Sequence, residues 1–98
     1  MISPVLQSGD WTPENTYEET LRPMEHERLK LSSVFLDRGP HSIEYRMEEA
    51  MLVPDLVTKA VEAEREGVDG LVVDCMADPG VDVLREGVSI PVVGPGRL

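Results

Sequence analysis

The chain has one cysteine, four aromatic residues and few basic side chains. A single cysteine cannot form an internal disulfide, so we expect a free thiol and a reducing, cytoplasmic compartment. Nine basic residues stand against nineteen acidic ones, and the net charge of −10 argues against nucleic acids and anionic membranes as partners. No apolar run approaches the roughly 20 residues of a membrane-spanning helix, and no signal peptide is recognisable.

What remains is the composition of an ordinary small globular protein. Its 98 residues are 41% hydrophobic, supplied mainly by Val, Leu, Ile and Met. We expect a single domain over residues 1–98 that buries roughly 60–65% of the surface of its unfolded chain. The sequence shows no internal repeat and no cluster of metal ligands.

The most informative stretch is Gly70-Leu-Val-Val-Asp-Cys-Met-Ala-Asp-Pro-Gly80. Its apolar run predicts a buried strand that ends near Cys75. Asp78 followed by Pro79 is typical of a helix cap and the first helical position. A thiol facing a helix N-terminus has its thiolate favoured by the helix dipole and by free N–H groups. Such a thiolate can attack a carbonyl or remove a proton from carbon.

Simpler interpretations of these residues stay open. Cys75 equally fits a small buried hydrophobic residue, which is the commonest role of a free cysteine. The neighbouring Asp74 would raise the pKa of the thiol, although strand alternation directs its side chain to the opposite face. Asp78 is explained by capping alone, and His41 by a solvated position in a turn.

Turn and cap signals divide the chain into four strands and three helices. Thr12 and Pro13 predict a helix start, Ser42 predicts a second cap, and Pro54 should kink or restart the second helix. Pro4 lacks a ladder donor, so we expect it at the end of the first strand. The expected strands span 2–6, 29–36, 70–75 and 90–93, and the expected helices span 13–22, 42–66 and 79–88.

The order βαβαβαβ with short loops predicts an α/β fold. We expect a three-layer parallel sheet with the flavodoxin-like strand order 2-1-3-4. In such sheets ligands bind at the carboxyl ends of the strands, where the Gly/Pro-rich turns of this chain fall. One helix cannot cover four strands, so one face of the sheet is left open. Either a further portion of chain or another subunit is expected to cover that face.

Three motifs go beyond a generic α/β pattern: Gly39-Pro-His-Ser-Ile-Glu44, Asp74-Cys-Met-Ala-Asp-Pro-Gly-Val-Asp82, and Ile90-Pro-Val-Val-Gly-Pro-Gly96. Together they resemble the aspartate/glutamate/hydantoin racemase family, most closely its hydantoin racemase branch. The similarity covers roughly residues 30–96, and residues 2–5 stand where the first strand of the family would be.

The resemblance implies a cofactor-independent racemase built of two similar α/β domains, each supplying one cysteine. One thiolate removes the α-proton of a small substrate, and the opposite thiol returns a proton to the other face. The substrate would be an amino acid, a hydantoin or a related carboxylate. Cys75 matches the catalytic cysteine of the first domain. The substrate-binding residues implied are Ser3, Pro4, Met76, Ala77 and Gly94.

The chain also departs from the family pattern. It has no second cysteine, and we expect the second domain of the family to be absent. It therefore resembles the N-terminal half of a racemase, one incomplete domain that is expected to form a homo-oligomer or to lack its second domain. The alternative is a non-catalytic binding or oligomerisation module derived from a racemase half, in which Cys75 would be buried and unreactive.

Overall fold

The computed structural model describes residues 1–97, and its elements follow the expected order βαβαβαβ. The strands are β1 (Ile2–Leu6), β2 (Val34–Leu36), β3 (Leu71–Val72) and β4 (Val92–Val93). The helices are α1 (Pro13–Thr16), α2 (Arg46–Arg65) and α3 (Val81–Gly87), with a π-helical turn η1 (Tyr17–Leu21) and the 3-10 turns η2 (Arg22–Met24) and η3 (Pro95–Arg97).

All strand pairs in the described residues are parallel. β1 pairs with β2, and β3 pairs with β4. A single bridge between Ile2 and Val73 places the two pairs side by side, and the Asp74 N–H donates to the Ile2 carbonyl at 2.9 Å. The parallel α/β class is confirmed. The three-layer arrangement in the order 2-1-3-4 stays a prediction.

The first strand contains Pro4 in its middle, so the expectation that Pro4 ends this strand is wrong. Pairing with β2 runs from Ser3 opposite Phe35 to Leu6 opposite Leu36, and the register shifts between these pairs. A proline has no N–H to donate, and an irregular stretch in the ladder accommodates it.

The second strand is much shorter than the expected range 29–36. His26 and Leu29 exchange backbone hydrogen bonds of 3.1 and 3.0 Å, which closes a tight turn where the strand was expected to begin. Leu29 is 37% exposed. The apolar residues that suggested a longer strand therefore lie outside the sheet.

The longest helix, α2, begins at Arg46 and not near Ser42, because a carboxylate three residues into the helix holds its start. Glu48 accepts from the backbone N–H groups of Glu44 and Tyr45 at 2.7 and 2.8 Å. The helix continues through Pro54 to Arg65, so it does not restart there, and the alternative of a kink stays a prediction. None of the described helices combines the length and apolarity needed to cross a membrane.

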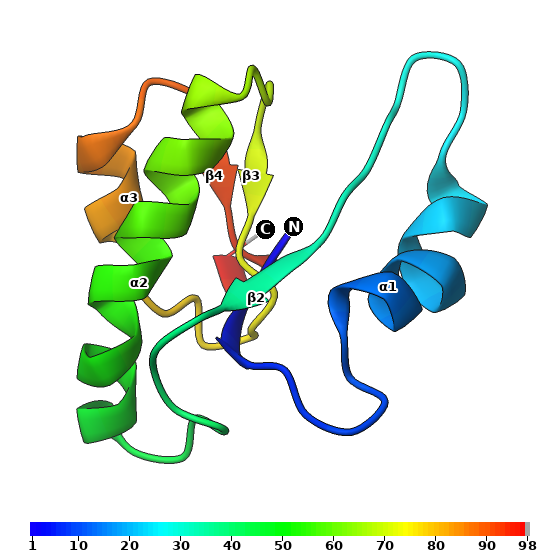
Figure 1. The fold of residues 1–98 in the computed structure, drawn as a ribbon. Coiled ribbons are helices and arrows are strands. Elements are labelled where there is room, and N and C mark those ends of the chain that lie inside the picture. The colour runs from blue at the N-terminus through cyan, green and yellow to red at the C-terminus, as the bar shows by residue number, and fades with distance from the viewer. Residues whose placement is uncertain (98) are drawn as a thin grey trace.

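Helices α2 and α3 pack on the same side of the strands (Figure 1). Between them and the strands lies the main core, formed by Ile2, Leu36, Leu52, Leu56, Ala60, Leu71, Val73, Val81, Leu84 and Val92. On the opposite face Val72 and Val93 lie side by side in the β3–β4 register and are 40% and 38% exposed. That face is open at β3 and β4, as the helix count predicted.

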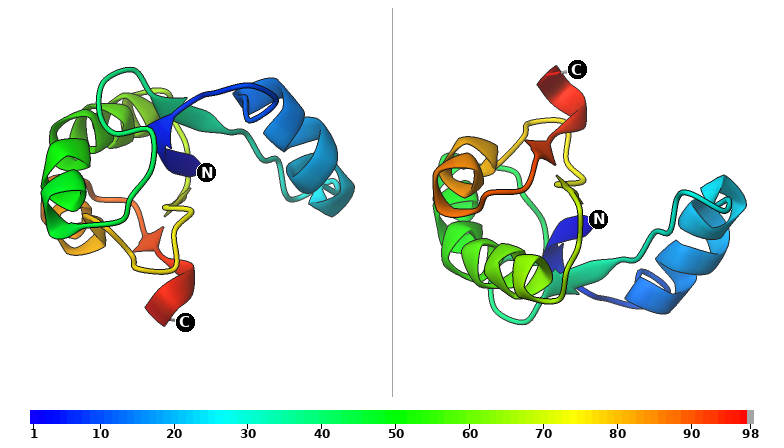
Figure 2. Two further views of the ribbon diagram at one scale, coloured as in Figure 1. Left: turned by 90° about the horizontal axis from the view of Figure 1, so that it is seen from below. Right: turned by 90° about the horizontal axis from the view of Figure 1, so that it is seen from above.

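Residues 7–33, which we call the arm, stand apart from the rest of the molecule (Figure 2). As expected, Thr12 caps α1 by accepting from the Asn15 N–H at 3.2 Å. The first helix nevertheless does not run regularly to residue 22, because it passes into η1 and η2. Trp11, at the base of the arm, packs edge-on against Phe35 of β2 with ring centroids 5.5 Å apart.

The arm folds on itself through Glu25. Its carboxylate accepts from the Tyr17 hydroxyl, and it accepts from the Leu31 N–H at 2.8 Å. These bonds, with that of Tyr17 the larger cause, hold the pKa of Glu25 below its ordinary value, and the same bond raises the pKa of Tyr17. A lowered carboxyl pKa stabilises the fold above its unfolded value of about 4.3, and this contribution is lost as the pH falls through the folded value.

Substitution Glu25→Ala is expected to open the arm locally, because Tyr17 and Leu31 both lose their acceptor. Amide hydrogen exchange at Leu31 should accelerate at pH 7, whereas the global unfolding midpoint should change little. Lowering the pH of the parent protein through the folded pKa of Glu25, which lies below its ordinary value, should likewise lower the protection factor of the Leu31 amide. The exposed Glu27→Ala is the matched control. Unchanged Leu31 exchange in Glu25→Ala would show that the carboxylate does not hold the arm.

Candidate functional site

Cys75 lies in the turn that follows β3, at the carboxyl end of that strand. The turn begins where the Val73 N–H donates to the Val93 carbonyl at 3.0 Å and the Cys75 N–H donates back to the Val73 carbonyl at 3.0 Å. It closes where the Asp78 N–H donates to the Cys75 carbonyl at 2.9 Å. The cysteine is half-buried. Its backbone is thus held on both sides, and its side chain is neither fully exposed nor sealed in the core.

Helix α3 starts later than expected. Its N-cap is Gly80, in a left-handed conformation with φ of 73° and with no side-chain cap, so the prediction that Asp78 caps it is wrong. The Val81 N–H faces the Asp78 carbonyl oxygen at 3.4 Å. A glycine fits this position because its missing Cβ would lie 2.6 Å from Leu56 Cδ2. The expected thiol facing a helix N-terminus is therefore replaced by a turn between Cys75 and a helix of seven residues.

The Gly94-Pro-Gly96 turn after β4 packs in direct contact with the turn of residues 75–78. A Cβ on Gly94 would lie 2.1 Å from Asp78 Oδ1, and a Cβ on Gly96 would lie 2.0 Å from the Met76 carbonyl oxygen. The Gly96 N–H donates to Asp78 Oδ1 at 2.9 Å. Only glycines allow this approach, so the turns at the ends of β3 and β4 form one packed unit.

The candidate substrate-binding residues fall into two groups. Met76, Ala77 and Gly94 belong to the packed unit: Met76 and Ala77 are exposed, and Gly94 is buried. Ser3 and Pro4 lie inside β1, next to Ile2, whose carbonyl accepts from the Asp74 N–H. Strand β1, which contains Ser3, therefore lies beside the chain segment that leads from β3 to Cys75.

Ser3 has an unusual environment for a hydroxyl. The residue is fully buried, and its oxygen has no hydrogen-bond partner within residues 1–97. A buried polar group without a partner is costly, and ligand binding is one reason for such a group to persist. The hydroxyl is enclosed by protein in this structure, and a role of Ser3 in substrate binding stays a prediction.

The carboxylate of Asp74, the residue before Cys75, lies near the positive charge of the Met1 ammonium. The Met1 ammonium donates to the Ser32 carbonyl at 2.7 Å, and burial lowers the pKa of this ammonium while the Asp74 carboxylate raises it. Asp74 itself is exposed.

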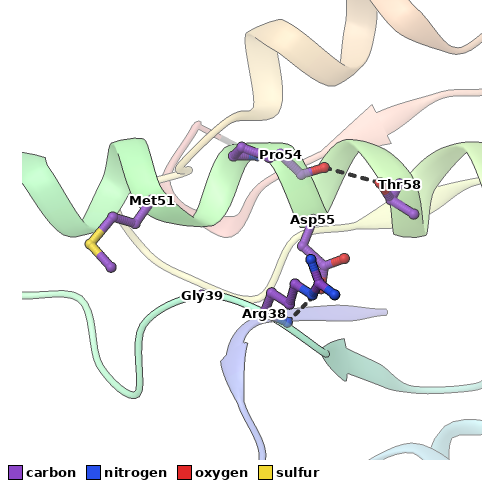
Figure 3. Close-up of a pocket in the computed structure, with 6 residues that line it drawn as sticks. All are labelled: Arg38, Gly39, Met51, Pro54, Asp55 and Thr58. Atoms are coloured by element: carbon purple, nitrogen blue, oxygen red, sulfur yellow. Dashed lines mark hydrogen bonds between the residues drawn. The ribbon is translucent and has the colours of Figure 1, made fainter.

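A cavity of about 490 Å³ opens elsewhere, between α2 and the turn after β2 (Figure 3). Figure 3 shows the Arg38 and Asp55 side chains next to each other, with Met51 at the other end. The lining residues are Arg38, Gly39, Met51, Pro54, Asp55 and Thr58. None of the candidate site residues lines this cavity. Within residues 1–97, no group of three or more His, Cys, Asp or Glu side chains is placed to hold a metal ion.

Sequence reasoning missed two carboxylates that fix the turns at this edge. Asp55 on α2 accepts from the N–H groups of Asp37 and Arg38 at 2.6 and 3.1 Å, which holds the turn after β2. Asp78 holds the turn after β4. No local pattern signals the Asp55 bonds, because 17 and 18 residues separate the partners. For Asp78 the two glycines at 94 and 96 were the available signal.

The fold and this edge define a parallel α/β protein with a candidate site in the turns after β3 and β4. The sequence profile of the family described as Asp/Glu/Hydantoin racemase matches residues 15–98. The chain therefore belongs to the Asp/Glu/hydantoin racemase family, and the resemblance drawn from its motifs is confirmed.

Individual relatives agree with this assignment. Over 56 residues the chain is 41% identical to a hydantoin racemase of Pseudomonas sp. (strain NS671), an alignment covering 57% of this chain and 22% of that protein. A hydantoin racemase of Rhizobium meliloti is 42% identical over 55 residues, covering 56% and 23%. The solved allantoin racemase from Klebsiella pneumoniae superposes with a TM-score of 0.81 at 27% identity, covering 95% of this chain and 37% of that one. The chain thus spans well under half the length of these proteins.

Proposed function

We propose that this chain carries one half-site of a cofactor-independent racemase, with Cys75 as the acid/base. The observation that supports this most is the family match over residues 15–98, combined with the position of Cys75 in a half-buried turn at the carboxyl end of β3. Substrates of the class would be hydantoins, amino acids or related carboxylates, all with a proton on a carbon next to a carbonyl group.

The chemistry proposed for Cys75 is proton transfer at that carbon. The Cys75 thiolate takes the α-proton, so an S–H bond forms as the C–H bond breaks, and the electron pair is delocalised into the adjacent carbonyl. A proton returned to the same face restores the starting enantiomer, whereas a proton delivered to the other face gives its mirror image. Inversion therefore needs an acid on each side of the planar carbanion.

The sequence has one cysteine, so the acid on the other face of the carbanion must be a group other than the Cys75 thiol of the same chain. We propose that the domain over residues 1–98 is one incomplete racemase-type unit of the three-layer order 2-1-3-4, completed by a second copy or by a second domain. The open face with Val72 and Val93 supports such association. Sedimentation at micromolar concentration tests it, and a lone 10.9 kDa species would contradict self-association.

Binding at Cys75 is tested by alkylation with iodoacetamide at pH 7.5 in the presence of candidate substrates. If the thiol lies in the substrate pocket, a 5-substituted hydantoin, allantoin or aspartate should slow the reaction in a saturable manner. Glutathione in place of the protein controls for direct effects of each compound on the reagent. Saturable protection supports a retained half-site. An alkylation rate independent of every compound would instead favour a racemase-derived module without substrate binding.

A further inference from the structure

Asp78 is buried, strained and bonded across two turns, although no catalytic step requires a carboxylate there. The residue is 5% exposed, and its φ of 51° lies in the left-handed region that few non-glycine residues adopt. Strained backbone of this kind persists where the surrounding contacts determine it, and it is concentrated near functional sites. Asp78 thus calls for a function other than the helix cap that the sequence suggested.

Its contacts connect the two turns of the packed unit. Through its backbone, the Asp78 N–H binds the Cys75 carbonyl at 2.9 Å. Through its side chain, Oδ1 accepts from the Gly96 N–H at 2.9 Å. The same oxygen would lie only 2.1 Å from a Cβ atom added to Gly94. One residue therefore fixes the cysteine turn to the end of the neighbouring strand.

We propose that Asp78 is a positioning residue for Cys75: its carboxylate fastens the Gly94–Gly96 turn onto the turn that carries the thiol. The role rests on the proposed function only in that Cys75 is the group being positioned. Without this bond, the turn after β4 loses its side-chain attachment to the cysteine turn, and the half-buried thiol becomes more accessible. An asparagine retains an oxygen acceptor and also tolerates the left-handed conformation, whereas an alanine retains neither property.

The test compares iodoacetamide alkylation rates of Cys75 in Asp78→Ala, Asp78→Asn and the parent protein, all shown to be folded by circular dichroism. Asp78→Ala is expected to react about tenfold faster, the change that losing one hydrogen bond to a charged acceptor allows. Asp78→Asn should fall closer to the parent. Asp69→Ala removes an exposed carboxylate and should leave the rate unchanged. An Asp78→Ala rate at or below the parental rate overturns the proposal.

Two further measurements separate positioning from a general loss of stability. Val57→Ala changes a residue of α2 that packs against the core, and it should destabilise the fold. Its alkylation rate should rise only as far as its unfolded fraction rises. In the parent protein the Gly96 amide should be protected from hydrogen exchange. If Asp78→Ala fails to fold, an unprotected Gly96 amide in the parent overturns the proposal, and a protected one whose protection Asp78→Asn largely retains supports it. None of these readouts uses a substrate, so failure of the racemase proposal would leave their outcome unaffected.

Discussion

Replacing Gly94 by alanine is expected to lower the free energy of unfolding by about 3 kcal/mol, the upper end of overpacking effects. The added Cβ would stand 2.1 Å from Asp78 Oδ1 and 2.5 Å from Asp78 Cγ. Both atoms belong to a buried side chain that is already bonded to Gly96, so it cannot move aside without breaking that bond. The melting temperature should fall by about 12 °C or more, since each kcal/mol shifts a domain of this size by about 4–8 °C.

The matched control is Gly87→Ala at the end of α3. A Cβ there meets nothing within 4 Å, and alanine is the better helix former. This variant should therefore be neutral or slightly stabilising in the same thermal unfolding experiment. Equal melting temperatures for Gly94→Ala and Gly87→Ala would show that the two turns are not packed as described.

Replacing Leu56 by alanine is expected to cost about 2–5 kcal/mol, because truncating a buried leucine loses transfer energy and leaves a cavity. Leu56 is completely buried in the main core. Its Cδ2 also lies 2.6 Å from where a Cβ on Gly80 would be, so its removal loosens the start of α3. Urea unfolding should show a lower midpoint with an unchanged dependence on denaturant.

Met51→Ala is the control for this prediction. Met51 lies on the same helix but is 53% exposed, so its truncation should change the free energy of unfolding by less than about 0.5 kcal/mol. If Leu56→Ala unfolded at the same urea concentration as Met51→Ala, Leu56 could not belong to the core of the folded protein.

The sequence was most informative where a local rule has one solution. Thr12 caps α1 as predicted. It failed where another contact close by in the chain displaced the expected one. Glu48 sets the start of α2 in place of Ser42, and the turn at His26 removes the first half of the expected second strand. Helix α2 also continues through Pro54, where a kink or a restart was predicted, and no restart occurs.

The position of Cys75 was predictable, but the construction of its turn was not. The motif around Cys75 predicted that the residue lies at the carboxyl end of a strand, and it follows β3 there. The roles of Asp78 and Gly94 depend on contacts between turns 16 or more residues apart, and periodicity carries no information about such contacts. Pro4 was expected at the end of a strand and lies within it, since the irregular register of β1 was not foreseeable from one proline.

The racemase proposal is tested most directly by following the α-proton of a 5-substituted hydantoin by NMR in D₂O at neutral pH. Cys75 acting alone on one face should exchange this proton for deuterium with retention of configuration, whereas a second copy facing it would also give inversion. The account therefore predicts loss of the α-proton signal with the parent protein and background exchange with Cys75→Ser. Exchange at the parental rate in Cys75→Ser, or no exchange above background with either protein, would contradict the assignment of Cys75 as the acid/base.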